Sequence, residues 1–167
     1  WKKIGIPDGD FESGPGKWSE DKADIGAVSR GDTLIKPASG KRMYGWTHKA
    51  GRDRKDVFLE NGIRQTIRTK PGHKYVLTAR AITAVTNGTR GDTRVRLAVD
   101  PKGGDELKGK NSSQWFWTDG KWMTVSHEFT AESKKATIAI GFFRWRDIDR
   151  ADAYTDNIRL YDLGVKA

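Results

Sequence analysis

With 167 residues, of which 35% are hydrophobic, the chain suits one domain with a single core, and we expect residues 1–167 to form that domain. It lacks cysteine, which excludes disulfides and thiolate metal sites, and no apolar run approaches the ~20 residues that span a bilayer. The formal net charge of +9 fits either a polyanionic partner or a role in solubility alone, whereas the 22 interspersed acidic residues exclude a polycationic tail that binds nucleic acid nonspecifically.

The chain opens on Trp1-Lys2-Lys3 and has no signal-peptide hydrophobic region there. We therefore expect a module excised from a larger protein, with any export signal removed. The acid-rich segment Asp8-Gly9-Asp10-Phe11-Glu12 follows. Its carboxylates are oxygen ligands of the kind that bind hard cations.

Apolar residues recur with a period of two along most of the sequence, which is typical of half-buried strands. Only residues 52–60 could form a turn or two of helix, and glycine, proline and aspartate supply turn chemistry between the other segments. The pattern predicts an all-β fold with strands over residues 42–48, 63–68, 75–82, 94–99, 113–117, 123–130, 136–143 and 154–163.

An Asn-Gly pair at 87–88, between two of these strands, is a frequent signal for a tight hairpin. A two-residue turn there would set Arg80 opposite Val95 and mix charged and apolar side chains on one face. We therefore expect a longer loop or a bulge, with Arg80, Arg94 and Arg96 on the same side of adjacent strands.

The strand at 136–143 has two different faces. One face is apolar, and the other combines small residues with aromatic rings, in the order Ala139, Gly141, Phe143 and Trp145. This second face could receive a flat ligand, or its rings could simply cover one end of the sandwich.

The closing segment, residues 153–162, places Asp156 before alternating apolar residues and predicts a last strand with a carboxylate at its start. Together with the acidic opening, it predicts a two-sheet antiparallel β-sandwich whose termini lie side by side and share a hard cation. The alternative is that these acids only cap turns or pair with the plentiful lysines and arginines.

Several segments resemble, in order and spacing, the jelly-roll carbohydrate-binding modules of the family 4, 9, 16 and 22 group. The resemblance extends over nearly the whole chain and implies a jelly-roll, galactose-binding-like sandwich. The segments are Asp10-Phe11-Glu12, Gly62-Ile63-Arg64-Gln65-Thr66-Ile67, Pro71-Gly72-His73-Lys74-Tyr75-Val76-Leu77-Thr78-Ala79, residues 122–129 and Tyr154-Thr155-Asp156-Asn157-Ile158.

The resemblance implies a structural Ca²⁺ between the first and last strands, with Glu12 and Asp156, and also Asp10, as ligands. It further implies that sugar binds across one sheet face. Modules for neutral glycans usually rely on aromatic rings with acids and amides, so the many arginines here are a departure. The guanidinium fork pairs with carboxylate or sulfate, and tryptophan offers a flat plate for a pyranose.

We therefore expect a non-catalytic module that binds an acidic polysaccharide, either a uronate polymer or a sulfated glycan, and targets an attached polysaccharide-degrading enzyme. Such a module would be secreted, and bacterial in origin, without contact to a membrane. The expected ligand-binding residues are Trp46, Arg80, Arg94, Arg96, Trp115, Trp117, Arg144, Trp145 and Arg146.

Alternative functions stay open at this level. A module for a neutral β-glycan, a structural sandwich that packs on a catalytic domain, and a polysaccharide lyase all fit the fold. Hydrolysis would require a poised carboxylate pair, which the sequence does not mark. Nucleic acid is disfavoured because no known recognition motif accompanies the adjacent arginines and tryptophans.

Overall fold

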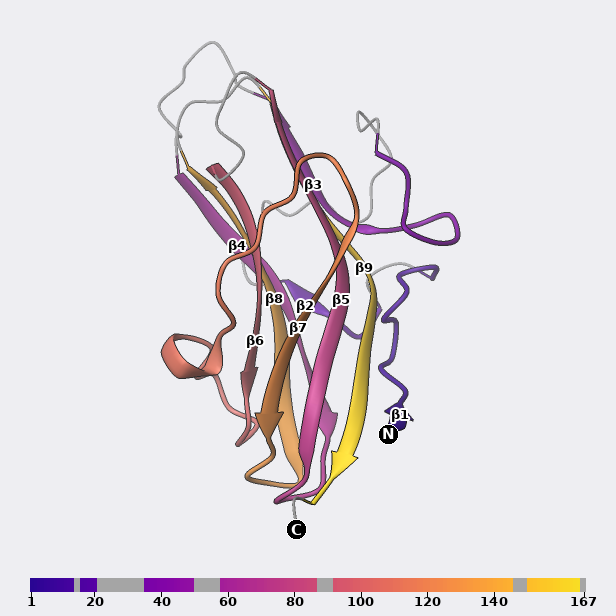
Figure 1. The fold of residues 1–167 in the computed structure, drawn as a ribbon, viewed down its shortest axis with the longest axis vertical. Helices are drawn as coiled ribbons and strands as arrows, with labels where there is room; N and C mark the ends of the chain where they lie inside the picture. Colours follow the sequence, from indigo (N-terminus) through magenta and orange to yellow (C-terminus); the bar gives the residue numbers. More distant parts are fainter. Residues whose placement is uncertain (14–15, 21–34, 50–57, 87–91, 146–149, 166–167) are drawn as a thin grey trace.

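The computed structural model describes residues 1–13, 16–20, 35–49, 58–86, 92–145 and 150–165. Two antiparallel sheets in this part of the chain stack into a β-sandwich, as the sequence predicts (Figure 1). The five-stranded sheet contains β1 (Lys2–Ile4), β3 (Tyr44–Lys49), β5 (Lys74–Thr86), β7 (Met123–Thr130) and β9 (Arg150–Gly164). The four-stranded sheet contains β2 (Ser19–Glu20), β4 (Phe58–Arg68), β6 (Thr93–Asp100) and β8 (Lys135–Trp145), and a short 3₁₀ turn spans Gly109–Asn111.

Seven of the eight predicted strands are confirmed, with some differences at their ends, whereas the predicted strand at 113–117 is only an isolated bridge in the structure. β7 has the predicted bounds, whereas β4 begins five residues earlier than expected, at Phe58. The helix considered at residues 52–60 lies mostly outside the described residues, and its last three positions belong to β4. Residues 113–117 run antiparallel beside β6 through the bridge between Val95 and Phe116. The sequence pattern missed β1 and β2, which are too short to show a period.

The core lies between the two sheets and follows the alternation of each strand. Leu77 of β5, Leu97 of β6, Ile140 of β8 and Leu160 of β9 are all fully or almost fully buried in one cluster. Their alternation with polar neighbours leaves the other face of each sheet available to solvent or to a ligand. Among the described residues, none forms a helix that is both long and apolar enough to cross a bilayer.

The expected pairing of the strands around 75–82 and 94–99 is wrong. β5 pairs with β7 and β9, whereas β6 pairs with β8, so the two strands belong to different sheets. Their apolar sides face each other across the core, which satisfies the same hydrophobic pattern as a hairpin. Arg80 therefore lies on the outer face of one sheet, and Arg94 and Arg96 lie on the outer face of the other.

The predicted proximity of the two chain ends is confirmed. β1 pairs with the second half of β9, with Lys3 opposite Tyr161, and β3 pairs with the first half. Figure 1 shows β1 beside β9 on the side away from β5. The backbone of Gly9 lies so close to Ile158 that a Cβ atom at Gly9 would be 2.5 Å from the Ile158 carbonyl oxygen. The opening segment is thus fixed against the last strand.

A hydrogen-bonded contact between His73 and Asp162 near the end of β9 makes stability depend on pH. His73 Nδ1 lies 3.0 Å from the nearer carboxylate oxygen of Asp162. Burial alone would raise the pKa of Asp162. Hydrogen bonds from His73 and from the Gly164 N–H outweigh this effect, together with the charges of His73 and Lys70, and the pKa of Asp162 lies below its ordinary value. Because the folded-state pKa is depressed, the stabilisation is present at neutral pH and is lost as pH falls through that pKa.

We expect the Asp162→Asn variant to lose less stability than the wild type between neutral pH and strong acid. Chemical denaturation at a series of pH values measures the free energy of unfolding for both proteins. Asp105→Asn is the matched control, because it makes the same charge change at a carboxylate that is 93% exposed. Identical pH profiles for wild type and Asp162→Asn would show that this pair contributes nothing to acid stability.

Candidate functional site

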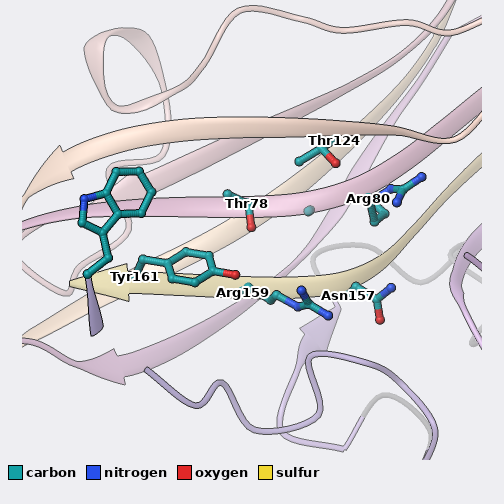
Figure 2. A pocket seen from close by; sticks show the side chains of 8 residues that line it. Thr78, Arg80, Thr124, Asn157, Arg159 and Tyr161 are labelled. Atoms are coloured by element: carbon teal, nitrogen blue, oxygen red, sulfur yellow. The ribbon is translucent and has the colours of Figure 1, made fainter. Parts of the chain in front are cut away.

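A groove on the outer face of the five-stranded sheet is the first candidate site. It has a volume of about 480 Å³, which lies within the range of ligand-binding clefts. The strands β5 and β9 form its floor, and β7 and the chain start border it (Figure 2). The residues that line it are Trp1, Thr78, Ala79, Arg80, Thr124, Asn157, Arg159 and Tyr161.

One end of the groove is aromatic. The pairing of β1 with β9 brings Trp1 next to Tyr161, with ring centroids 6.3 Å apart and planes tilted by 50°. Trp1 is 89% exposed, although such a large ring is usually covered in a folded protein. These two rings therefore present apolar surface to anything that enters the groove.

The other end of the groove is cationic. Figure 2 shows Arg159 beside Asn157 on β9, with Arg80 across from them on β5. Arg159 is exposed, whereas Arg80 is partly buried and its Nε has no hydrogen-bond partner among the described residues. The described lining contains two guanidinium groups and no carboxylate, so this end of the groove attracts anions.

The strand register explains how the lining forms. Thr78 lies opposite Arg159, and Arg80 lies opposite Thr124, so neighbouring strands add polar groups to the same face. A register shift between Thr78 and Arg80, where Asn157 has a φ of +50°, turns β9 locally. A bulge of this kind re-aims side chains and places Asn157 at the groove.

A second candidate surface lies on the outer face of the four-stranded sheet. We call it the arginine–aromatic stack, defined as Arg94, Arg96, Trp115, Trp117 and Phe143. The Arg96 guanidinium carbon lies 4.4 Å from the centroid of Trp115, and that of Arg94 lies 5.3 Å from Trp117 and 5.9 Å from Phe143. The rings of Trp115 and Phe143 are 5.3 Å apart. The structure thus brings together four of the predicted site residues.

Of the four remaining predicted ligand-binding residues, the structure describes the side chain of Arg144 alone. Arg144 is only 3% exposed and follows Phe142 toward the buried side of β8, so the expectation that it meets a ligand at an open surface is wrong. Trp46 pairs with Ala153 and Trp145 with Phe58 through their backbones, but their side chains lie outside the described atoms. Arg146 lies outside the described residues.

Sequence reasoning missed Trp1, Arg159 and Tyr161 as site residues. A signal for the latter two existed in the last strand, because Arg159 and Tyr161 alternate with the buried Ile158 and Leu160. Trp1 gave no such signal, since the three-residue β1 that positions it has no readable period.

The predicted cation ligands Glu12 and Asp156 meet at one loop. The Glu12 carboxylate accepts hydrogen bonds from the backbone N–H groups of Lys41 and Arg42, at 2.7 and 2.8 Å. The Asp156 carboxylate accepts one from the Ser39 N–H at 3.2 Å. Residues far apart in sequence thereby hold a single loop. Asp10 instead accepts the N–H of Glu12 at 3.2 Å, as a turn cap would.

Electrostatics at this loop favour a cation. Asp156 is fully buried, and burial raises its pKa to about 6. The negative charge of Glu12 also raises this pKa, whereas hydrogen bonds from the backbone N–H groups of Ser39 and Asn157 lower it. Among the described residues no group of three or more acidic, histidine or cysteine side chains gathers. All four oxygens of the two carboxylates accept backbone N–H bonds, and each keeps a second lone pair of the kind that Ca²⁺ binds.

No protein-family model and no curated protein sequence matches the chain. Solved structures do match it in fold. TmCBM61 in complex with beta-1,4-galactotriose aligns with a TM-score of 0.64 and 16% identity over 94% of this chain and 97% of that one. The CBM22-1 xylan-binding domain of Paenibacillus barcinonensis Xyn10C aligns with a TM-score of 0.56 and 13% identity over 94% and 93% of the two chains.

A structure with a different role is also similar. A cyclase from Fischerella sp. TAU in complex with 4-(1H-indol-3-yl)butan-2-one aligns with a TM-score of 0.61 and 15% identity over the full length of both chains. The chain therefore has the jelly-roll fold of carbohydrate-binding modules, as the sequence resemblance implies. Because the same fold also serves a cyclase, function has to be argued from the site.

Proposed function

We propose that the protein is a non-catalytic carbohydrate-binding module that holds an acidic polysaccharide, such as a uronate polymer or a sulfated glycan, in the groove over β5 and β9. The observation that carries this proposal is the pair of guanidinium groups, Arg80 and Arg159, in a groove whose described lining has no carboxylate. A uronate carboxylate or a sugar sulfate supplies the planar or tetrahedral oxygens that a guanidinium binds bidentately.

The rest of the lining suits the other parts of a sugar. Tyr161 and Trp1 offer apolar ring surface to the C–H face of a pyranose, and Thr78, Thr124 and Asn157 offer polar groups to its hydroxyls. Alternate residues of a strand on one face are ~7 Å apart, so Tyr161 and Arg159 can contact neighbouring parts of one chain. Stacking at one end and ion pairing at the other would fix the direction of the glycan.

The lining also supports binding without hydrolysis. A glycoside hydrolase needs two carboxylates ~5–9.5 Å apart across the scissile bond, and no carboxylate lines the described groove. A lyase is the one rival with a specific observation in its favour, because Tyr161 and Arg159 are neighbours on one face and could act as base and charge neutraliser. Unsaturated uronate, detected by ultraviolet absorbance, would identify that activity.

The proposal includes a structural Ca²⁺ held by Glu12 and Asp156. The ion would neutralise two neighbouring carboxylates and tie the chain start to β9, which carries one side of the groove. It also includes an attached polysaccharide-degrading enzyme that the module brings to its substrate. With its polysaccharide outside the cell, the module would act as a secreted protein.

Affinity electrophoresis tests the ligand class directly. We expect polygalacturonate, alginate or a sulfated glycan in the gel to retard the protein, with retardation falling as salt rises because the contacts are ionic. Xylan and β-glucan serve as neutral comparisons. Retardation by the neutral glycans alone would refute the acidic ligand, and free migration in every gel would favour a structural sandwich.

A further inference from the structure

The arginine–aromatic stack has features that a merely structural cluster does not need. Its members come from three separate segments: β6, β8 and the strand-like stretch at 113–117. Arg94 lies over the rings of Trp117 and Phe143, and Arg96 lies over Trp115, so each guanidinium is held against aromatic surface. Each contact of this type is an electrostatic attraction between the cation and the ring face, and it orients both groups.

The stretch at 113–117 is anchored to β6, which holds the stack in place. The N–H of Phe116 donates to the Val95 carbonyl at 2.7 Å, and the N–H of Val95 donates back to the Phe116 carbonyl at 2.8 Å. The N–H of Ser113 donates to the Leu97 carbonyl at 2.8 Å. Phe116 packs against the core, so alternation turns Trp115 and Trp117 to the outer face.

Exposure points to a ligand at the stack. Trp117 is 49% exposed, and Trp1 is the other exposed tryptophan among those the structure describes. Trp1 lies at one end of the groove, whose other end carries one pair of arginines, and Trp117 lies at the stack beside another pair, on the opposite sheet. Among the described residues, each outer face of the sandwich therefore presents an open indole ring and two guanidinium groups.

We propose that the stack is a second binding surface for an acidic glycan, separate from the groove. The inference deepens the proposed function and rests on it, because the ligand class is the same. Charge complementarity selects the occupant: two cations held against aromatic rings match a chain that carries one anionic group per sugar and has an apolar ring face. Since the two surfaces lie on opposite faces, one protein molecule can hold two glycan chains.

Isothermal titration with a short oligogalacturonate, and with a sulfated oligosaccharide of similar length, tests the number of sites. Each wild-type chain should bind two molecules of at least one of these oligosaccharides. Trp117→Ala should lower that number to one, or weaken one of two resolved sites at least ~10-fold. Because Trp117 is half exposed, its truncation is compatible with folding, which thermal melting checks. Val165→Ala, at a residue 67% exposed, is the control and should keep two sites.

The groove variant Arg159→Gln separates the two proposals. If the groove functions alone, the wild type binds one oligosaccharide, Arg159→Gln weakens it and Trp117→Ala does not, which overturns the second surface. If the stack functions alone, the wild type binds one oligosaccharide and only Trp117→Ala weakens that binding, which overturns the proposed role of the groove. Poly(U) is included as a probe, and loss of poly(U) binding in Trp117→Ala with no effect on either glycan would assign the stack to nucleic acid and overturn this inference.

Light scattering with long polygalacturonate gives an independent readout. A protein with two binding surfaces should cross-link the polymer and raise the turbidity. At the same protein-to-polymer ratio, neither Trp117→Ala nor Arg159→Gln should do so. Equal turbidity for the wild type and both variants would show that bridging does not occur and would contradict the two-surface arrangement.

Discussion

Replacing Arg159 with Gln should lower the affinity of the groove for a short oligogalacturonate by a factor of about ten or more. A hydrogen bond to a charged group contributes roughly 1.5–3 kcal/mol, and 1.4 kcal/mol corresponds to a factor of ten in affinity. Arg159 is exposed on β9, so its loss should not disturb the core. Titration in a Trp117→Ala background measures the groove without a contribution from the opposite face.

Two further variants sharpen this prediction. Arg159→Lys keeps the charge but loses the planar fork, so its affinity should fall between those of the wild type and Arg159→Gln. Arg68→Gln removes one charge from an exposed residue of the other sheet, and it should leave the affinity unchanged. Equal weakening by Arg68→Gln and Arg159→Gln would mean that overall charge, rather than a fitted groove, attracts the polysaccharide.

Most of the fold could be predicted from the sequence, because the alternation of apolar and polar residues along a strand is a local signal. The buried Ile138, Ile140 and Phe142 of β8 alternate with more exposed residues in the way the pattern predicts. Burial of one face per strand is enough to define an all-β sandwich. The two shortest strands, which have no such alternation, escaped prediction although they extend the two sheets.

Strand partners could not be read from the same pattern. An apolar face on β5 and one on β6 can meet beside each other within a sheet or across the core between sheets, and both arrangements bury the same atoms. The structure has the second arrangement, which separates Arg80 from Arg94 and Arg96. One predicted binding face thus became two surfaces.

Parts of the site depended on contacts that no local pattern encodes. Trp1 reaches the groove only because β1 pairs with β9, and that pairing joins the two ends of the chain. Trp115 and Trp117, in contrast, share a face by simple alternation, and that prediction holds. Residue types suggested the chemistry from the sequence, whereas the long-range register determined which residues could act together.

Removing calcium should lower the melting temperature of the protein by about 5–11 °C. A ligand at 100 times its dissociation constant stabilises the folded state by ~2.7 kcal/mol, and 1 kcal/mol shifts the melting temperature of a chain of this size by ~2–4 °C. The effect follows because Ca²⁺ would neutralise Glu12 and the buried Asp156, whose pKa of about 6 reflects chiefly the cost of burying its charge. Calorimetry with Ca²⁺ and with a chelator measures the shift.

The Asp156→Asn variant distinguishes a calcium site from a simple loop clamp. Its carboxamide cannot supply the anionic ligand, so calcium should no longer raise its melting temperature. In chelator it should melt at or above the wild type, because a neutral side chain avoids a buried, uncompensated charge next to Glu12. Asp105→Asn, at an exposed carboxylate, should keep the full calcium effect. If chelator leaves the wild type unchanged and native mass spectrometry detects no bound calcium, the two carboxylates serve only to hold residues 39–42 against β9.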